Sequence, residues 1–231
     1  MKNHLPNAVT CLNLFAGCLA ITRVFAGNLE LAAYLVGLAA AFDFADGLLA
    51  RALHASSPIG KDLDSLADMV SFGVVPGAIA FSLLQQALPA HGLPGWLAYL
   101  GFVITIFSAL RLAKFNNDTR QTTSFIGLPT PACTLVVASL PLILAYDGFG
   151  LTNFILNPWV LLGLAVLLSG LLVAEIPLFA LKFKNLSWQD NSLRFVFLLL
   201  AIGLLLGLQA AAIPLIVLLY VLLSMLRPSV G

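Results

Sequence analysis

The chain has 231 residues with a net charge of +1, and its mean hydropathy is +1.03. Hydrophobic residues make up 61% of it and charged residues 9%, against about 45–50% and about 25% in soluble domains. This composition excludes an ordinary soluble protein and indicates one that crosses a membrane many times. The near-neutral charge gives no sign of a nucleic-acid partner.

Apolar runs long enough to span a bilayer, which takes about 20 residues of helix, follow one another along the chain. The first of them are expected at 8–26, 30–53, 65–86, 95–114, 129–146 and 158–180. The final run, 193–226, is too long for one span, and Gly207, Gln209 and Pro214 offer a turn within it. Splitting it gives helices at 193–208 and 211–226. The sequence thus predicts an all-α polytopic membrane protein with about eight transmembrane helices, or one fewer if the final run is a single tilted helix.

Positive side chains collect at one set of helix ends in this arrangement. They are Lys2, Arg51, Lys61, Arg111, Lys114, Arg120, Lys182, Lys184, Arg194 and Arg227. Arg23 falls at the other set of ends, and the loops 87–94 and 147–157 contain no Lys or Arg. Because cytoplasmic loops are enriched in Lys and Arg, we expect both termini to be cytoplasmic. The expected location is a prokaryotic-type cytoplasmic (inner) membrane.

Four carboxylates stand out in this apolar sequence: Asp43 and Asp46 in the segment DFADGLLAR (43–51), and Asp64 and Asp68 in the segment DLDSLAD (62–68). Asp43 and Asp46 share one helix face, and Asp64 and Asp68 share another. An ionised Asp near a bilayer centre costs about 2.5–3.5 kcal/mol, so such a cluster needs a cation. The two segments end one expected helix and begin the next at the cytoplasmic side. Hard divalent cations, which prefer carboxylate oxygens, are the simplest partner.

Small and basic residues surround the acids. Gly47 and Ala50 carry almost no side chain, so a ligand could approach the backbone there. Arg51 and Lys61 border the same segment and suit phosphate oxygens. From the residues alone, we interpret the pattern as a metal-dependent membrane enzyme that handles a phosphorylated substrate.

The full pattern, Asp43-x2-Asp46-Gly47-x2-Ala50-Arg51-x8-Gly60-x3-Asp64-x3-Asp68, resembles the signature of the CDP-alcohol phosphatidyltransferases. The resemblance implies a six-helix catalytic core, here residues 1–180, that usually forms a homodimer, and residues 181–231 would add two C-terminal transmembrane helices. It also implies two divalent metal ions, Mn²⁺ or Mg²⁺, that bind the diphosphate of a CDP-linked lipid.

The resemblance also implies roles for individual residues. Asp43, Asp46 and Asp64 would be metal ligands, and Asp68 would complete the metal site and act as the catalytic base for the acceptor hydroxyl. The nucleotide and diphosphate would contact Asn7, Thr10, Gly47, Ala50, Arg51, Gly60 and Lys61. For Asn7 and Thr10 the alternative is a role in beginning the first helix.

Four further stretches resemble one branch of the family, the CDP-diacylglycerol–serine O-phosphatidyltransferases. They are LPNAVTCLNLFAG (5–17), SLADMVSFGVVPG (65–77), RLAKFN (111–116) and FIGLPTPA (125–132). This resemblance implies that the phosphatidyl group of CDP-diacylglycerol, a lipid of the membrane, is transferred to L-serine. CMP would be the other product.

Three polar residues at the end of the fourth expected helix are candidates for binding the serine carboxylate or a phosphate: Arg111, Lys114 and Asn116. The alternative is that they only anchor the topology. Other acceptors, namely glycerol 3-phosphate, inositol phosphate or choline, would leave the chemistry unchanged. A cation transporter and a non-catalytic membrane subunit are the alternatives from other classes, and neither explains the Gly, Ala, Arg and Lys around the acids.

Overall fold

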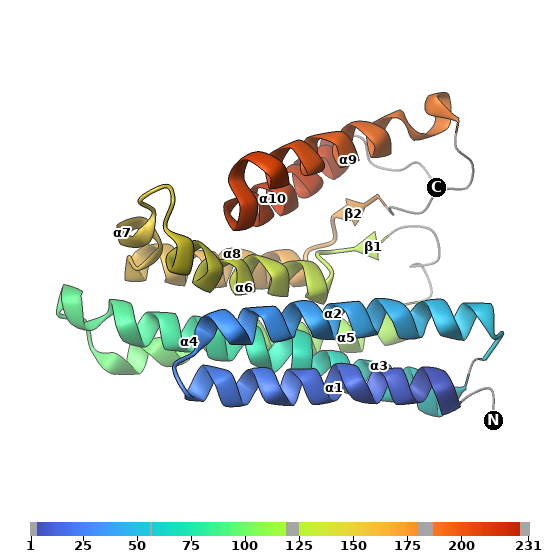
Figure 1. Cartoon of the computed structure of the whole chain (residues 1–231), viewed down its shortest axis with the longest axis horizontal. Coiled ribbons are helices and arrows are strands. Elements are labelled where there is room, and N and C mark those ends of the chain that lie inside the picture. Colours follow the sequence, from blue (N-terminus) through green and yellow to red (C-terminus); the bar gives the residue numbers. More distant parts are fainter. Residues whose placement is uncertain (1–3, 56, 119–124, 180–186, 227–231) are drawn as a thin grey trace.

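The computed structural model describes residues 4–55, 57–118, 125–179 and 187–226. Over these residues the chain is an all-α bundle, as predicted (Figure 1). Five helical stretches in the described part are long and apolar enough to cross a membrane, and two shorter apolar helices lie among them. The first helices are α1 (His4–Phe25), α2 (Leu29–Ala52), α3 (Pro58–Met69) and α4 (Val75–Ala87).

The helix α3 runs into α4 without a break, and together they form the most deeply buried of the candidate spans. They are joined by a turn of π-helix, η1 (Val70–Val74), in which Val75 N donates to Val70 O. Two neighbouring helices contact this turn through hydroxyl groups. Thr105 Oγ1 donates to Gly73 O at 2.8 Å, and Thr134 Oγ1 donates to Phe72 O at 2.9 Å.

The second half of the bundle surrounds this central helix. After a short 3-10 turn, η2 (Pro89–His91), the chain continues through η3 (Gly95–Phe102), α5 (Val103–Asn117), α6 (Thr130–Tyr146), α7 (Thr152–Ile155) and α8 (Pro158–Val173). The helix η3 packs closely on α4 because Gly101 has no side chain: a Cβ there would lie 2.5 Å from Phe81 N.

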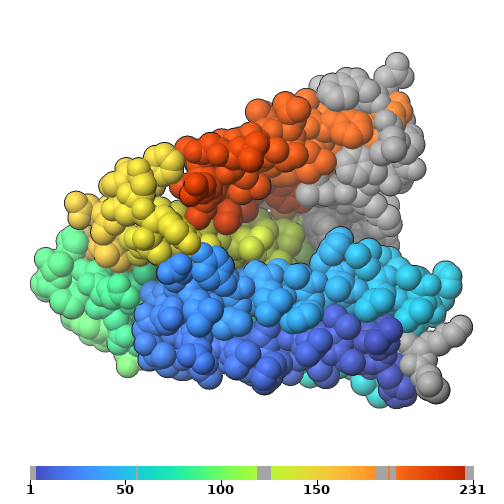
Figure 2. Space-filling view, in the orientation of Figure 1, coloured from blue at the N-terminus to red at the C-terminus, as the bar shows by residue number. Residues whose placement is uncertain are grey.

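The final apolar run forms two helices rather than one, as expected. They are α9 (Trp188–Leu208) and α10 (Ala212–Leu226), and η4 (Gln209–Ala211) reverses the chain between them. The backbone of Gln209 has a φ of +50°, a value that a helix interior does not allow. The hairpin lies over α6 and α8, and Figure 2 shows a furrow between it and α2 with α6 at its floor.

Some helix boundaries differ from the predicted ones. The helix α3 begins at Pro58 rather than at residue 65, because Ser57 caps it: Ser57 Oγ accepts a hydrogen bond from Gly60 N at 3.0 Å. Gly60 and Lys61 therefore lie on the helix, before its predicted start. The first expected helix likewise begins earlier, at His4.

The sixth predicted helix ends early, at Val173 rather than at residue 180. Beyond it the chain is extended, and β2 (Pro177–Leu178) pairs antiparallel with β1 (Phe125–Ile126). Leu128 N donates to Leu171 O at 2.8 Å, so the last turn of the helix bonds to another segment. Pro177 also disfavours helical backbone at Ile176, the residue before it. The expected division at residue 180 lies outside the described residues, as do Lys2, Arg120, Lys182, Lys184 and Arg227.

Candidate active site

Three of the four aspartates form one cluster where α2 ends and α3 begins. Carboxylate oxygens of Asp43, Asp64 and Asp68 all lie within 4.8 Å of one another, and the three side chains are partly buried. The short connection after Ala52 brings the two helix ends together, and the i, i+4 spacing places Asp64 and Asp68 on one face. Three carboxylates at this separation repel one another, so the arrangement favours a divalent cation between them.

Asp46 lies one helical turn after Asp43 and is not part of this group of three. Its side chain is buried, with 6% of its surface exposed, and its Oδ2 has no hydrogen-bond partner among the described residues. A buried carboxylate oxygen without a donor is costly, and a bound cation would remove that cost. The residues present therefore fit the divalent metals that the sequence pattern implied, and Asp46 remains a predicted ligand.

A hollow of about 270 Å³ lies beside the cluster, between α1, α2 and α3. It is lined by Pro6, Asn7, Thr10, Asp46, Gly47, Ala50, Ala55, Ser57, Gly60, Lys61 and Asp64. Every residue predicted to contact the nucleotide is in this lining except Arg51. The Arg51 guanidinium lies over Gly47, since a Cβ on Gly47 would be 3.7 Å from one of its nitrogens. Asp64 belongs to both the hollow and the carboxylate cluster, so the two are contiguous.

Gly60, in the lining of the hollow, has a steric reason to be a glycine. A Cβ on Gly60 would lie 3.1 Å from both Asn7 Oδ1 and Ser57 Oγ. The start of α1 therefore packs directly on the first turn of α3. This close contact brings Asn7 and Thr10 of α1 to a site whose acids come from α2 and α3.

Asn13 belongs to the site although the sequence pattern does not indicate it. Its side chain is fully buried in α1, and Asn13 Nδ2 donates to Asp68 Oδ1 at 3.3 Å. The available signal was an amide in an apolar helix, one turn after Thr10 and therefore on the same face. That signal does not reveal the partner, which lies on another helix.

A second hollow, of about 330 Å³, contains two of the three predicted acceptor contacts. Arg111 and Lys114 line it together with Asn117, Asp118, Glu175 and residues of β1 and the end of α8. Arg111 is buried, with 5% exposed, and its Nε has no hydrogen-bond partner among the described residues. Its guanidinium lies 5.0 Å from the centre of the Phe115 ring.

Asn116, the third predicted contact, points elsewhere. Asn116 Nδ2 donates to Ser65 Oγ at 2.8 Å, and its main-chain oxygen accepts from Lys61 Nζ at 3.1 Å. It therefore links the end of α5 to the start of α3 and does not line the hollow that contains Arg111. A contact between Asn116 and the substrate stays a prediction.

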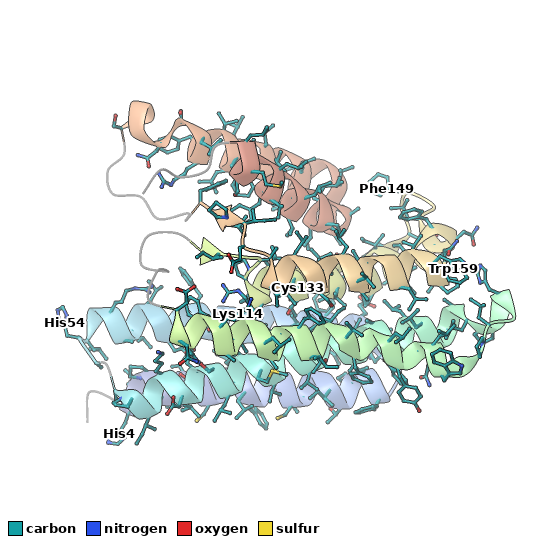
Figure 3. The ribbon with its side chains drawn as sticks, turned by 180° about the vertical axis from the view of Figure 1, so that it is seen from behind. His4, His54, Lys114, Cys133, Phe149 and Trp159 are labelled. Carbon is teal, nitrogen blue, oxygen red and sulfur yellow. The ribbon has the colours of Figure 1, made fainter. Side chains whose placement is uncertain are left out.

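These features occupy one end of the bundle. Figure 3 shows His4 and His54, which mark the start of α1 and the connection after α2, at one end, and Phe149 and Trp159 at the opposite end. The acids lie in the second half of α2 and in α3, the two helices that the connection with His54 joins, hence toward His54. The end with Phe149 contains a different hollow, of about 480 Å³, lined by apolar side chains.

Comparison with known proteins places this arrangement in a family. The sequence profile described as CDP-alcohol phosphatidyltransferase matches residues 3–171. This range includes the whole lining of the first hollow and, except for residues 172–175, the lining of the second. A CDP-diacylglycerol–serine O-phosphatidyltransferase of Bacillus subtilis is 36% identical over 160 residues, which are 67% of this chain and 88% of that protein.

Two other relatives have the same name. The Helicobacter pylori protein (strain J99) is 30% identical over 212 residues, covering 90% of this chain and 84% of the relative. The Mycobacterium leprae protein is 33% identical over 181 residues, covering 75% of this chain and 57% of the relative. With the profile matched across most of its length, the chain is an enzyme of the CDP-alcohol phosphatidyltransferase family.

Proposed function

We propose that this enzyme transfers the phosphatidyl group of CDP-diacylglycerol to the hydroxyl of L-serine, forming phosphatidylserine and releasing CMP. The observation that carries the proposal is the cluster of Asp43, Asp64 and Asp68 beside the hollow between α1, α2 and α3. The names of the relatives support serine as the acceptor.

The hollow suits the CDP end of the lipid. Gly47, Ala50 and Gly60 leave space along the backbone for a flat base, and Lys61 and Arg51 supply positive charge for phosphate oxygens. Asp43, Asp46 and Asp64 would hold two divalent cations, Mn²⁺ or Mg²⁺. When bound, such ions neutralise the diphosphate and polarise the phosphorus that is attacked.

Asp68 is the proposed base. As the serine oxygen forms its bond to phosphorus and the bond to the CMP oxygen breaks, the hydroxyl proton moves to the Asp68 carboxylate. Asp68 lies one turn from Asp64, so it is next to the diphosphate subsite without lining the hollow itself. We propose direct attack of serine, without a phosphatidyl-enzyme intermediate.

The second hollow is the proposed serine site. Arg111 and Lys114 would bind the carboxylate of serine, and Glu175 and Asp118 would face its ammonium group. A buried guanidinium whose Nε has no partner among the described residues is suited to a carboxylate ligand. Charges of both signs fit a zwitterion better than glycerol 3-phosphate or inositol phosphate, which have no ammonium group.

Orientation and assembly are part of the proposal. We infer an active site at the cytoplasmic face of an inner membrane with both termini on that side, because Arg51, Lys61, Arg111 and Lys114 gather at this end. A homodimer is inferred from the family resemblance.

The test is a transfer assay with purified protein, CDP-diacylglycerol and labelled L-serine in the presence of Mn²⁺ or Mg²⁺. Release of CMP with formation of phosphatidylserine is the expected result. If serine fails and glycerol 3-phosphate, inositol phosphate or choline reacts, the serine proposal is wrong and the chemistry stands. If folded protein releases no CMP with any acceptor, the proposed reaction itself is wrong.

Replacing Arg111 tests the serine site. We expect Arg111→Gln to raise the serine KM by at least about tenfold, because a buried carboxylate contact is lost, and to change the KM for CDP-diacylglycerol by less than about twofold. Arg23→Gln, at the other end of the molecule, is the control and should leave both KM values unchanged. An unaltered serine KM in folded Arg111→Gln would remove Arg111 from the serine site.

A further inference from the structure

Asn13 is a buried polar residue in an apolar helix, and the helix itself gives no reason for a polar side chain there. It is fully buried in α1, and the neighbours Leu12 and Leu14 are apolar. A buried amide costs free energy unless its groups are hydrogen-bonded. Its Nδ2 has a partner, Asp68 Oδ1 at 3.3 Å, whereas its Oδ1 has none among the described residues. A residue kept only for packing would be better replaced by a hydrocarbon of similar size.

The main chain at Asn13 is also fixed to the helix that carries Asp68. Ser71 Oγ donates to Asn13 O at 3.1 Å, and Ser71 lies one turn after Asp68 in the π-helical turn. Gly17, one turn after Asn13, permits this approach, since a Cβ there would clash with Ser71 Oγ. Asn13 is thus connected twice to the same short stretch, through its side chain and through its carbonyl.

We propose that Asn13 is a positioning residue that orients the Asp68 carboxylate for proton transfer. By donating to Oδ1, it fixes the rotation of the carboxylate and leaves Oδ2 to accept the proton of the acceptor hydroxyl. The Ser71 contact keeps α1 in register, so that the amide stays at the height of Asp68. This inference rests on the proposed role of Asp68 as the base and assigns Asn13 no contact with substrate.

Two substitutions of similar size remove the donor. Asn13→Leu has no polar group, and Asn13→Asp places a second carboxylate oxygen opposite Asp68. For both we expect kcat to fall by at least about tenfold, within the range attributed to a positioned base, with the KM for CDP-diacylglycerol changed by less than about twofold. The unfolding temperature of Asn13→Leu should stay close to that of the wild type, because the loss of an unsatisfied buried oxygen offsets the loss of the donor to Asp68. Cys11→Ala, at an exposed position of α1, is the matched control and should change neither quantity.

A double-substitution cycle separates positioning from a general structural effect. If Asn13 acts through Asp68, Asn13→Leu should lower kcat much less in an Asp68→Asn background than in the wild type. Equal losses in the two backgrounds, or a kcat of Asn13→Leu within twofold of the wild type, would overturn the proposal. If Asn13→Leu does not fold, Ser71→Ala tests the same arrangement. It should lower kcat without raising the KM for CDP-diacylglycerol, and an unchanged kcat would count against the proposal.

The same assays distinguish this inference from the proposed function. An active wild type with an unaffected Asn13→Leu variant would remove only the role of Asn13. Activity with another acceptor but not with serine would overturn the serine proposal, and the Asn13 series would then be measured with that acceptor. The rise in unfolding temperature caused by Mn²⁺ with CDP gives an independent measurement. It should be the same in Asn13→Leu as in the wild type, and its loss would mean that Asn13 acts on ligand binding instead.

Discussion

Asp68→Asn is expected to lower kcat by about 10²–10⁴-fold, the range attributed to general acid–base catalysis. The amide keeps the size of the side chain but cannot take a proton from the acceptor hydroxyl. Binding should change less, because Asp68 does not line the hollow proposed for the nucleotide. The measurement is steady-state transfer to serine at saturating CDP-diacylglycerol, together with the rise in unfolding temperature caused by CDP and Mn²⁺.

Asp62→Asn is the matched control for this experiment. Asp62 lies on the same helix, two positions from Asp64, and its side chain is exposed. The substitution has the same chemistry but lies off the face shared by Asp64 and Asp68, so activity should stay within about twofold of the wild type. Should folded Asp68→Asn retain a third of the wild-type kcat, Asp68 would not be the base.

Asp64→Asn is expected to abolish both ligand binding and turnover. Asp64 is shared by the carboxylate cluster and the hollow, so its loss affects the proposed metal site and the diphosphate subsite together. We expect the apparent affinity for Mn²⁺ to fall by at least about 100-fold, since even residues that only support metal ligands account for about 10–100-fold. Manganese-dependent stabilisation by CDP, followed by thermal unfolding, should disappear.

Chelation provides the complementary measurement. Removing divalent metal from the wild type with EDTA should stop transfer, and adding Mn²⁺ or Mg²⁺ should restore it, whereas Asp64→Asn should recover little at any accessible concentration. Asp62→Asn again serves as the control. Full activity of the wild type in excess EDTA would contradict a metal-dependent mechanism and would require another explanation for the grouping of Asp43, Asp64 and Asp68.

Much of the fold and part of the site could be predicted from local patterns. Composition, the lengths of the apolar runs and the turn residues within the last run were enough for the bundle and the C-terminal hairpin, because each transmembrane helix satisfies its own backbone hydrogen bonds. The spacing of Asp43, Asp64 and Asp68 was enough to bring them together, because two helix ends joined by a short loop leave little freedom. The start of α3 could also have been predicted, since Ser57 followed by Pro58 is a typical helix N-terminus.

Contacts between distant segments could not be predicted in this way. The end of α8 depends on hydrogen bonds from Gly127 and Leu128, which lie far away in the sequence. The importance of Asn13 depends on Asp68, on another helix. Asn116 shows the opposite problem: it lies near Arg111 and Lys114 in the sequence but bonds to Ser65 in a different direction. Sequence proximity on a helix does not determine which neighbour a side chain faces.

The π-helical turn at Val70–Val74 also sets the rotation of Asp64 and Asp68 relative to α4. The hydrogen bond of a π-turn spans one residue more than that of an α-turn. Each residue of an α-helix turns the chain by about 100°. Inserting a further residue here would therefore rotate Asp64 and Asp68 by about a quarter of a circle relative to α4, away from Asp43, whereas deleting one would convert the π-turn into an α-turn and largely keep that register. The segment between Asp68 and Pro76 should therefore accept the loss of one residue more readily than the gain of one, whereas the connection after Ala52 must stay short to keep the two helix ends together.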